Sequence, residues 1–309
     1  MQSPKKVLID GSSGTTGLRI ADRLKEREDI ELIHIPDVLR RDPDERKKAM
    51  QAADIVFLCL PDDASREASA WIGEDTVVID TSTAFRVDPD WVYGFAELPG
   101  MREKIRRAHR IANPGCHASG FIALVAPLVG AGLLDHDCLL SCMSLTGYTG
   151  GGKKMIADYE DDARKQALEA PRMYALGQTH KHLPEMVHFT GLNNAPVFCP
   201  VVGAFAQGME VVVPLHRQWL KGSPEDIEEL YAAFYREGLI RFRKGTDEAG
   251  FMSAGSMAGR DDMEVTVCGS GERVLLVSRF DNLGKGASGA AIQNMNLVLG
   301  VDETTGLKV

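Results

Sequence analysis

The sequence predicts an α/β protein with two domains: a doubly wound parallel sheet, followed by an α+β domain with a mixed or antiparallel sheet. Three observations indicate this fold. The chain has 309 residues, of which 44% are hydrophobic, so it is long enough to bury two cores. Strand-like and helical runs alternate through about the first 115 residues, as in a parallel sheet with helices on both faces. From about residue 116, strand-like runs follow one another with few helices between them.

The first domain is predicted to contain five strands joined by helical runs, because short apolar runs alternate with amphipathic ones. The strands are expected near residues 6–10, 31–35, 55–60, 76–80 and 109–112. Ligands of such sheets bind beyond the carboxyl ends of the strands. The turns that follow these strands are therefore the first candidates for a site.

The second domain is predicted to begin with a helix over 117–133. Residues 141–153 alternate as a strand that ends in three glycines, and a second helix is expected near 224–237. Further strands are expected near 172–176, 186–190, 197–203, 208–214, 263–269 and 273–280. Because an apolar sheet face left exposed often mediates self-association, we expect a homodimer or homotetramer.

A glycine-rich loop opens the last helical run, which we expect to return to the first domain. The predicted division is a nucleotide-binding domain of 1–115 and 285–309, and a catalytic and oligomerisation domain of 116–284. The loop offers backbone N–H groups and a lysine to an anion. The residues expected to contact the nucleotide here are Asn282, Gly284, Lys285 and Gly286.

The loop after the first strand carries glycines at three-residue spacing, which favours a dinucleotide site. Glycines there permit a tight turn and close approach of a pyrophosphate, although the second glycine departs from the standard fingerprint. The alternative is a strand-to-helix turn that uses glycine for its backbone angles alone. The expected cofactor-binding residues are Gly11, Ser12, Ser13, Gly14, Thr15, Thr16 and Gly17.

Two further turns are expected to face the cofactor or substrate, at Pro61 and at Ser82, although Pro61 is also a typical helix start. The turn after the second strand leaves the cofactor open. Asp37 suits a free ribose hydroxyl, as in NAD, whereas Arg40 and Arg41 suit a 2′-phosphate, as in NADP.

Cys116 follows Pro114 and Gly115 and precedes an apolar helical run, so it is placed as a nucleophile at a helix start. Unpaired N–H groups and the helix dipole favour a thiolate there. The alternative is a buried cysteine that only packs.

His180 and His182 lie two residues apart, on one face if the segment is extended. An imidazole paired with the cysteine takes up the thiol proton and later returns one. The alternatives are a solvated surface histidine and a metal site, but no third ligand stands at a familiar zinc spacing, so no metal is predicted.

Composition excludes several classes of protein. The net charge of −9, with both signs interspersed, disfavours nucleic acid and anionic membranes as partners. No apolar stretch reaches the length needed to span a bilayer, so we expect a soluble, cytoplasmic protein. The six cysteines lack CxxC spacing, which disfavours a disulfide framework and a structural zinc site. Those other than Cys116 are predicted to be core residues, Cys199 less clearly than Cys59, Cys138, Cys142 and Cys268.

Five motifs occur in the order seen in N-acetyl-gamma-glutamyl-phosphate reductases, and the chain resembles the shorter type of that family over essentially its whole length. The motifs are GSSGTTG at 11–17, NPGC at 113–116, GYTGGGK at 147–153, HKHLPE at 180–185 and NLGKGA at 282–287. The resemblance implies an NADPH-dependent enzyme of arginine biosynthesis. It also implies a Rossmann-type domain and a catalytic domain like that of glyceraldehyde-3-phosphate dehydrogenase.

The resemblance implies that Cys116 attacks the acyl phosphate of N-acetyl-glutamyl 5-phosphate, forming a thioester that hydride from NADPH reduces to N-acetyl-glutamate 5-semialdehyde. His182, in preference to His180, is the implied acid and base. The implied substrate-binding residues, which hold the carboxylate or the departing phosphate, are Arg86, Asn113, Gly150 and Lys153, or Lys154 in place of Lys153.

The chain departs from the family pattern at His117, where Tyr or Phe is usual. The extra imidazole either tunes the pKa of the nucleophile or points to solvent. Two other functions remain open: an aspartate-semialdehyde dehydrogenase with the same thioester chemistry, and a catalytically silent NADP-sensing protein whose Cys116 is unreactive.

Overall fold

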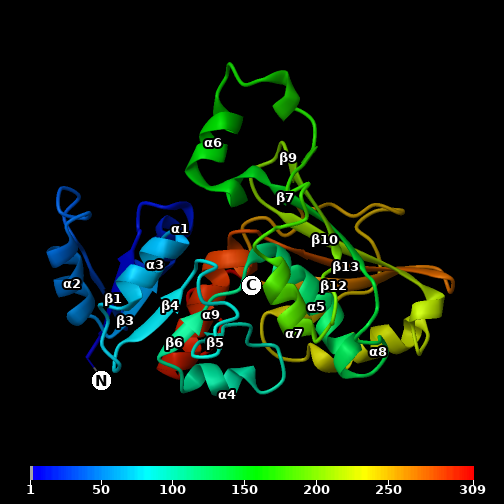
Figure 1. The fold of residues 1–309 in the computed structure, drawn as a ribbon, viewed down its shortest axis with the longest axis horizontal. Coiled ribbons are helices and arrows are strands. Elements are labelled where there is room, and N and C mark those ends of the chain that lie inside the picture. Colours follow the sequence, from blue (N-terminus) through cyan, green and yellow to red (C-terminus); the bar gives the residue numbers. More distant parts are fainter. Residues whose placement is uncertain (1–2) are drawn as a thin grey trace. The chain divides into compact units, whose positions relative to one another are not determined.

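The chain divides into two compact units in a computed structural model that describes residues 3–309. Unit 1 comprises the chain up to Pro114 together with Ala287–Leu307, and unit 2 comprises Gly115–Gly286 with Lys308–Val309 (Figure 1). Compared with the predicted domains, unit 2 gains Gly115, Lys285, Gly286 and the last two residues. Lys308 belongs there because its backbone exchanges hydrogen bonds with Asp261.

Unit 1 contains the predicted doubly wound parallel sheet, with strand order β2-β1-β3-β4-β6-β5. A strand stands at each of the five predicted places, and a short sixth strand, β5, extends one edge. The strands are β1 (Lys5–Asp10), β2 (Ile30–Ile33), β3 (Ile55–Leu58), β4 (Val77–Asp80), β5 (Val92–Tyr93) and β6 (Arg110–Ala112).

Helices cover both faces of this sheet. Met50 of α2 and Ala68 of α3 join one apolar cluster with Val56 and Val78 of the strands. On the other face α9 packs against β4, α1 and α4. The helices of unit 1 are α1 (Thr15–Leu24), α2 (Pro43–Gln51), α3 (Asp62–Ser69), α4 (Met101–Arg106) and α9 (Gly289–Leu299).

Unit 2 is built on a mixed seven-stranded sheet, ordered β11-β12-β13-β10-β7-β9-β8, which confirms the predicted second fold class. The central pairs β12–β13, β13–β10 and β10–β7 are antiparallel, whereas β7 runs parallel to β9. The strands are β7 (Ser141–Gly147), β8 (Arg172–Met173), β9 (Val197–Gly203), β10 (Met209–His216), β11 (Ile240–Phe242), β12 (Met263–Gly269) and β13 (Arg273–Phe280).

Three helices lie together on one side of this sheet: α5 (Cys116–Gly130), α7 (Leu183–Thr190) and α8 (Pro224–Phe234) (Figure 1). A 3-10 turn, η1 (Tyr148–Gly151), and α6 (Gly152–Glu160) follow β7 and lie at the other end of unit 2 from α8. Short turns η2 (Gln166–Leu168) and η3 (Arg217–Trp219) and the π-helical turn η4 (Gly284–Ser288) complete the elements.

The buried helix α5 holds the centre of unit 2. A Cβ at Gly120 would lie 2.4 Å from a methyl of Val211, so the missing side chain lets the helix approach β10 closely. Pro127 inside the helix has no N–H to donate to the carbonyl of Ala123, four residues earlier. The hydroxyl of Tyr235 donates to that carbonyl at 2.6 Å instead. The proline is thus accommodated without an unsatisfied buried group.

Two sequence predictions in unit 2 are wrong. Residues 186–190 belong to helix α7, because Pro184 in its first turn favours a helix start and the apolar run that follows fits either period. The strand predicted over 141–153 stops at Gly147, and the glycines after it form η1 and the start of α6, with Gly152 at φ +73°.

Candidate functional site

The glycine loop of unit 1 needs glycine for two physical reasons. Gly11 adopts φ +86°, and a Cβ there would lie 2.3 Å from the carbonyl oxygen of Cys59. A Cβ at Gly17 would lie 2.5 Å from the carbonyl oxygen of Gly11, so the loop and α1 pack backbone against backbone. Gly14 is the N-cap of α1 and has no side chain to cap the first-turn N–H groups. This arrangement fits a bound pyrophosphate.

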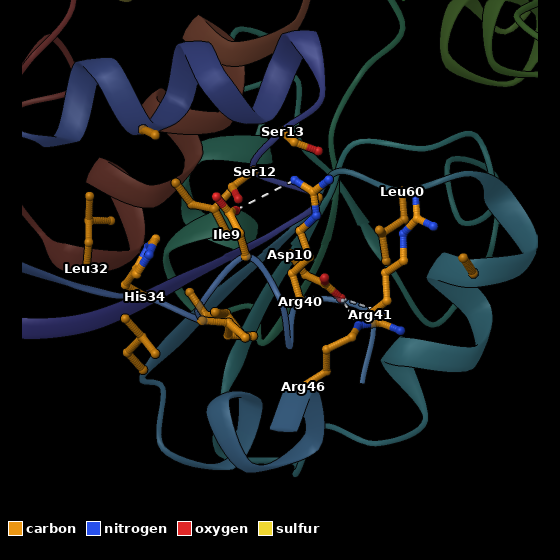
Figure 2. A pocket seen from close by; sticks show the side chains of 17 residues that line it. Ile9, Asp10, Ser12, Ser13, Leu32, His34, Arg40, Arg41, Arg46 and Leu60 are labelled. Carbon is orange, nitrogen blue, oxygen red and sulfur yellow. Dashed lines mark hydrogen bonds and ion pairs between the residues drawn. The ribbon is translucent and has the colours of Figure 1, made fainter. Parts of the chain in front are cut away.

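A pocket of about 450 Å³ adjoins this loop within unit 1. Gly11, Ser12 and Ser13 line it from the loop, and Asp37, Arg40 and Arg41 line it from the turn after β2 (Figure 2). The pocket therefore brings the loop and both candidate ribose-recognising groups together.

Arginine side chains dominate the charge of this pocket beside the turn after β2. Arg46 is held by Asp10, whose carboxylate lies 2.6 Å from the guanidinium, so these two charges offset each other (Figure 2). Arg40 approaches Asp37 only to 3.7 Å, and both side chains are largely exposed. With Arg41 added, the cationic groups outnumber the anionic ones.

Cys116 is the first residue of α5, as predicted, and is partly exposed. Its N-cap residue, Gly115, is extended (φ −79°, ψ 144°) and has no side chain to cap the helix. A Cβ at Gly286 would lie 2.9 Å from the Cβ of Cys116. The second glycine-rich motif therefore lies directly against the cysteine, and its glycine is what leaves room.

Glu185 connects the turn before Cys116 to His182. One carboxylate oxygen accepts the Gly115 N–H at 3.1 Å, and the other lies 4.0 Å from Nε2 of His182. Both side chains are buried. Glu185 is the last residue of the HKHLPE motif, but the sequence analysis predicts no role for it. A carboxylate three residues after a histidine at a helix start lies beside it on the helix surface, so this spacing is the sequence signal for a contact between Glu185 and His182.

The rings of His180 and His182 contact each other, with centroids 4.7 Å apart. The segment is not extended, because His182 has helical angles (φ −86°, ψ −12°) as the N-cap of α7. Its backbone N–H donates to Nδ1 of His180 at 3.2 Å, which leaves Nε2 to carry the proton of a neutral His180 ring.

His117 points into this cluster rather than to solvent, with only 3% of its surface exposed. Its ring lies 5.5 Å from those of both His180 and His182. Nδ1 lies 2.7 Å from the Ser144 hydroxyl, and Nε2 lies 2.7 Å from the Tyr174 hydroxyl. Burial, assisted by the charge of His180, lowers the pKa of His117 to about 3, so this ring is neutral.

Sequence reasoning missed Ser144 and Tyr174. Ser144 lies two residues after Cys142, on the same buried face of β7, so a polar residue on a buried face was the available signal. Tyr174 follows β8 and is placed by the pairing of β8 with β9, which no local pattern reveals. Burial and the charge of a Cys116 thiolate raise the pKa of Tyr174, so the phenol keeps its proton.

Of the five other cysteines, all predicted to be core residues, Cys142 is buried, whereas Cys59, Cys138, Cys199 and Cys268 are partly exposed. Burial raises the pKa of Cys59 to about 12 and also raises the pKa values of Cys138, Cys142 and Cys268. These four thiols are therefore poor nucleophiles near neutral pH.

The other residues predicted for unit 1 are mostly tied into its backbone. Arg86 donates to the carbonyls of Asn113 and Thr81. The Asn113 amide donates to the carbonyl of Ala287 and accepts from Asn294. Ser82 donates to the buried carboxylate of Asp80 at 2.6 Å. Pro61 is the exposed N-cap of α3.

In unit 2 the predicted cofactor contacts are buried, whereas the predicted substrate contacts are exposed. Asn282 is buried, with its amide bonded to Thr149 and Gly208. Lys285 is also buried, and a Cβ at Gly284 would meet a backbone carbonyl. Gly150 of η1 and Lys153 in the first turn of α6 are exposed, as is Lys154.

Among residues 3–309, no group of three or more His, Cys, Asp or Glu side chains is arranged to hold a metal ion. Over the same residues, every helix is too short or too polar to cross a membrane.

Two family models match the chain. The semialdehyde dehydrogenase dimerisation domain matches residues 116–282, and the semialdehyde dehydrogenase NAD binding domain matches residues 37–108.

Similar curated proteins cover nearly the whole chain. N-acetyl-gamma-glutamyl-phosphate reductase of Brucella anthropi is 48% identical over 307 residues, covering 96% of this chain and 98% of that protein. The protein of the same name from Brucella ovis is also 48% identical, covering 96% and 99%.

Similar solved structures share the fold at low identity. Aspartate semialdehyde dehydrogenase II of Vibrio cholerae, complexed with ASA, has a TM-score of 0.72 at 18% identity, covering 97% of this chain and 99% of that one. Aspartate semialdehyde dehydrogenase of Candida albicans, with NADP, has a TM-score of 0.66 at 15% identity, with the same coverage.

Proposed function

The chain belongs to the semialdehyde dehydrogenase family and, within it, to the N-acetyl-gamma-glutamyl-phosphate reductases, and we propose that it reduces N-acetyl-glutamyl 5-phosphate. The products are N-acetyl-glutamate 5-semialdehyde and phosphate, in arginine biosynthesis, with NADPH as reductant. The observation that carries this proposal is the junction of Cys116, Glu185 and His182. The thiol lies at a bare helix start, and one carboxylate, that of Glu185, accepts the N–H of the preceding residue Gly115 and lies 4.0 Å from the His182 imidazole.

The chemistry begins with Cys116. Its thiolate attacks the acyl carbon, the new S–C bond forms and the C–O bond to phosphate breaks, leaving a thioester. The nicotinamide cofactor, when bound, supplies the hydride that reduces this thioester. The C–S bond then breaks, which releases the aldehyde and restores the thiolate.

His182 is the proposed acid and base. It takes the proton of the Cys116 thiol before attack and gives it to the oxygen that becomes negative when hydride adds to the thioester. It takes the proton back from this tetrahedral hydroxyl as the aldehyde forms. Glu185, 4.0 Å from its Nε2, favours the protonated ring and links it to the turn that carries the nucleophile. His180 is the second choice, because its Nδ1 already accepts a backbone N–H.

The proposed cofactor is NADP(H) rather than NAD(H). The glycine loop has the close backbone approach that a pyrophosphate needs, at Gly11 and Gly17. Arg40 and Arg41 line the adjoining pocket and suit a 2′-phosphate, whereas Arg46 is already offset by Asp10. Ser12, Ser13, Thr15 and Thr16 add hydroxyls, and Pro61, Ser82, Asn282, Gly284, Lys285 and Gly286 remain proposed contacts.

For the substrate, Lys153 and Gly150 are the favoured contacts, with Lys154 as an alternative. They are exposed and lie after β7, the strand that carries Ser144. Arg86 and Asn113 remain proposed, although their hydrogen bonds to backbone groups also suit a role in holding the loop.

We also propose a homo-oligomer, at least a dimer, located in the cytoplasm. Met143, Val197 and Leu275 are 49%, 58% and 40% exposed, and all three lie on the sheet face opposite α5. An apolar strip of this kind suits burial against a second copy. The matching family model is a dimerisation domain.

The test is phosphate-dependent reduction of NADP by the purified protein, supplied with N-acetyl-glutamate 5-semialdehyde or, in parallel, aspartate 4-semialdehyde. Activity with the first alone is expected. Activity with the second would make the chain an aspartate-semialdehyde dehydrogenase. Binding of NADPH without turnover of either aldehyde would favour a silent sensor.

A further inference from the structure

His117 connects two hydroxyls that come from different parts of unit 2. Ser144 lies on β7 and Tyr174 follows β8, and each hydroxyl lies 2.7 Å from a different nitrogen of the ring. The His117 ring is buried and the Ser144 side chain is fully buried. Both ring nitrogens of His117 therefore have a hydrogen-bond partner, and His117 directly follows the proposed nucleophile, Cys116.

The protons in this chain of groups have two possible arrangements. A neutral imidazole donates from one nitrogen and accepts at the other. If Nδ1–H donates to Ser144, the Tyr174 proton is directed at Nε2. If the Ser144 hydroxyl donates to Nδ1, Nε2–H donates to the Tyr174 oxygen, and the Tyr174 proton is left for another acceptor.

The nearby cysteine favours the second arrangement. Tyr174 lies close enough to Cys116 for a thiolate there to raise the pKa of the phenol, so the phenol stays a neutral donor. A hydrogen bond to an ionised acceptor is about twice as strong as a bond between neutral groups. A Tyr174 proton directed at the sulfur therefore gains more than one directed at Nε2 of a neutral ring.

We propose that Ser144, His117 and Tyr174 form a hydrogen-bond relay in which His117 is a positioning residue that holds the Tyr174 hydroxyl as a donor to the Cys116 sulfur. This inference rests on the proposed role of Cys116 as nucleophile. It gives His117, where the family usually carries Tyr or Phe, a defined action through Tyr174. The relay stabilises the thiolate without placing another charge in the cluster.

The test is the pH dependence of Cys116 alkylation by iodoacetamide in the full chain, with Cys116→Ser as the blank. Tyr174→Phe removes the donor to sulfur and is expected to move the midpoint upward by roughly 1 pH unit. His117→Phe keeps a ring of similar size but neither nitrogen, and is expected to move the midpoint in the same direction. Ser144→Ala is expected to give a smaller upward shift.

Two further variants separate a relay from loss of packing. His117→Gln restores an N–H near the position of Nε2, so it is expected to return part of the shift. In the double variant His117→Phe with Tyr174→Phe, the midpoint is expected to match that of Tyr174→Phe alone, because both changes remove one interaction. The other titratable groups around Cys116, namely His180, His182, Glu185 and Lys285, are unchanged throughout.

The relay is overturned if His117→Phe leaves the midpoint at the wild-type value while Tyr174→Phe moves it, or if the two shifts add. Should His117→Phe fail to fold, His117→Gln and Ser144→Ala decide, since a flat profile in both contradicts the relay. Alkylation requires no substrate, so failure of the relay and failure of the proposed function are distinguishable. If the midpoints shift as expected in a protein that oxidises neither semialdehyde, the relay is retained and the proposed function is rejected.

Discussion

The glycine loop of unit 1 and the Cys116 cluster of unit 2 are built in opposite ways. The loop depends on atoms that are absent, because a Cβ at Gly11 or Gly17 would lie within 2.5 Å of a backbone oxygen. The cluster depends on side-chain atoms that are present, since two imidazole rings and two hydroxyls lie around His117 and the Glu185 carboxylate accepts the Gly115 N–H just before Cys116. Adding atoms should therefore damage the first site, and removing atoms the second.

The largest expected effect comes from exchanging one atom in unit 2, the sulfur of Cys116. Cys116→Ser replaces a good nucleophile by a hydroxyl with a far higher pKa, so turnover is expected to fall about 10³-fold or more. NADPH binding, followed by its fluorescence, is expected to stay unchanged because the cofactor residues of unit 1 are untouched. Turnover within tenfold of wild type would contradict the covalent mechanism.

Adding one methyl group in unit 1 is expected to weaken cofactor binding and to leave the reactivity of Cys116 unchanged. Gly11→Ala puts a Cβ 2.3 Å from the Cys59 carbonyl at φ +86°, which costs about 3 kcal/mol of folding free energy. We expect weak NADPH binding with normal alkylation of Cys116. The matched control is Gly73→Ala, where nothing lies within 4 Å of the added Cβ. Equal loss in both variants would mean that close approach at Gly11 is not the cause.

The next largest expected effect is a pH dependence of folding stability, because the cluster of unit 2 contains the buried, neutral ring of His117. The pKa of His117 falls from 6.5 to about 3 on folding, so the unfolded chain binds the extra proton between these values. Stability from this group is complete above about pH 6.5 and is lost as the pH falls, by about 2.7 kcal/mol at pH 4.5.

His117→Phe should remove this dependence. Urea unfolding at several pH values between 7 and 4.5 measures it, with the unaltered chain as reference. Parallel curves for the two proteins would show that His117 is not neutral in the folded state.

The smallest expected effect concerns the helix that carries Cys116. Tyr235→Phe leaves the buried Ala123 carbonyl without the hydroxyl that replaces the missing N–H of Pro127, a loss of about 1.5 kcal/mol. Activity per folded molecule should not change. Tyr148→Phe is the control, because its hydroxyl makes only a long, exposed contact with Glu160. A stability loss no greater than that of the control would refute this account of Pro127.

Local sequence predicted unit 1 more fully than unit 2. In unit 1 the strands and helices follow from local periodicity, and the loop at 11–17 follows from its glycine spacing. The close approach of Gly11 to the Cys59 carbonyl is a tertiary contact that this spacing does not reveal. The cluster in unit 2 joins segments about 60 residues apart. Cys116 and His182 are predicted site residues that the motifs indicate, whereas Tyr174 is placed by strand pairing that no local pattern encodes.

The errors have the same origin. Residues 186–190 are apolar enough for a strand, and only Pro184 with the turn at His182 distinguishes a helix. The inward direction of His117 depends on hydroxyls from β7 and from the segment after β8, so its burial follows from the tertiary fold and not from its own neighbours.

The most direct test of the thioester is a phosphate-free reaction of the protein with N-acetyl-glutamate 5-semialdehyde and NADP. With phosphate omitted, the acyl group has no acceptor other than water. The account predicts a rapid burst of one NADPH per chain, a covalent acyl adduct on Cys116 in the intact mass, and steady turnover once phosphate is added. Steady turnover without phosphate, or a burst without an adduct on Cys116, would contradict it.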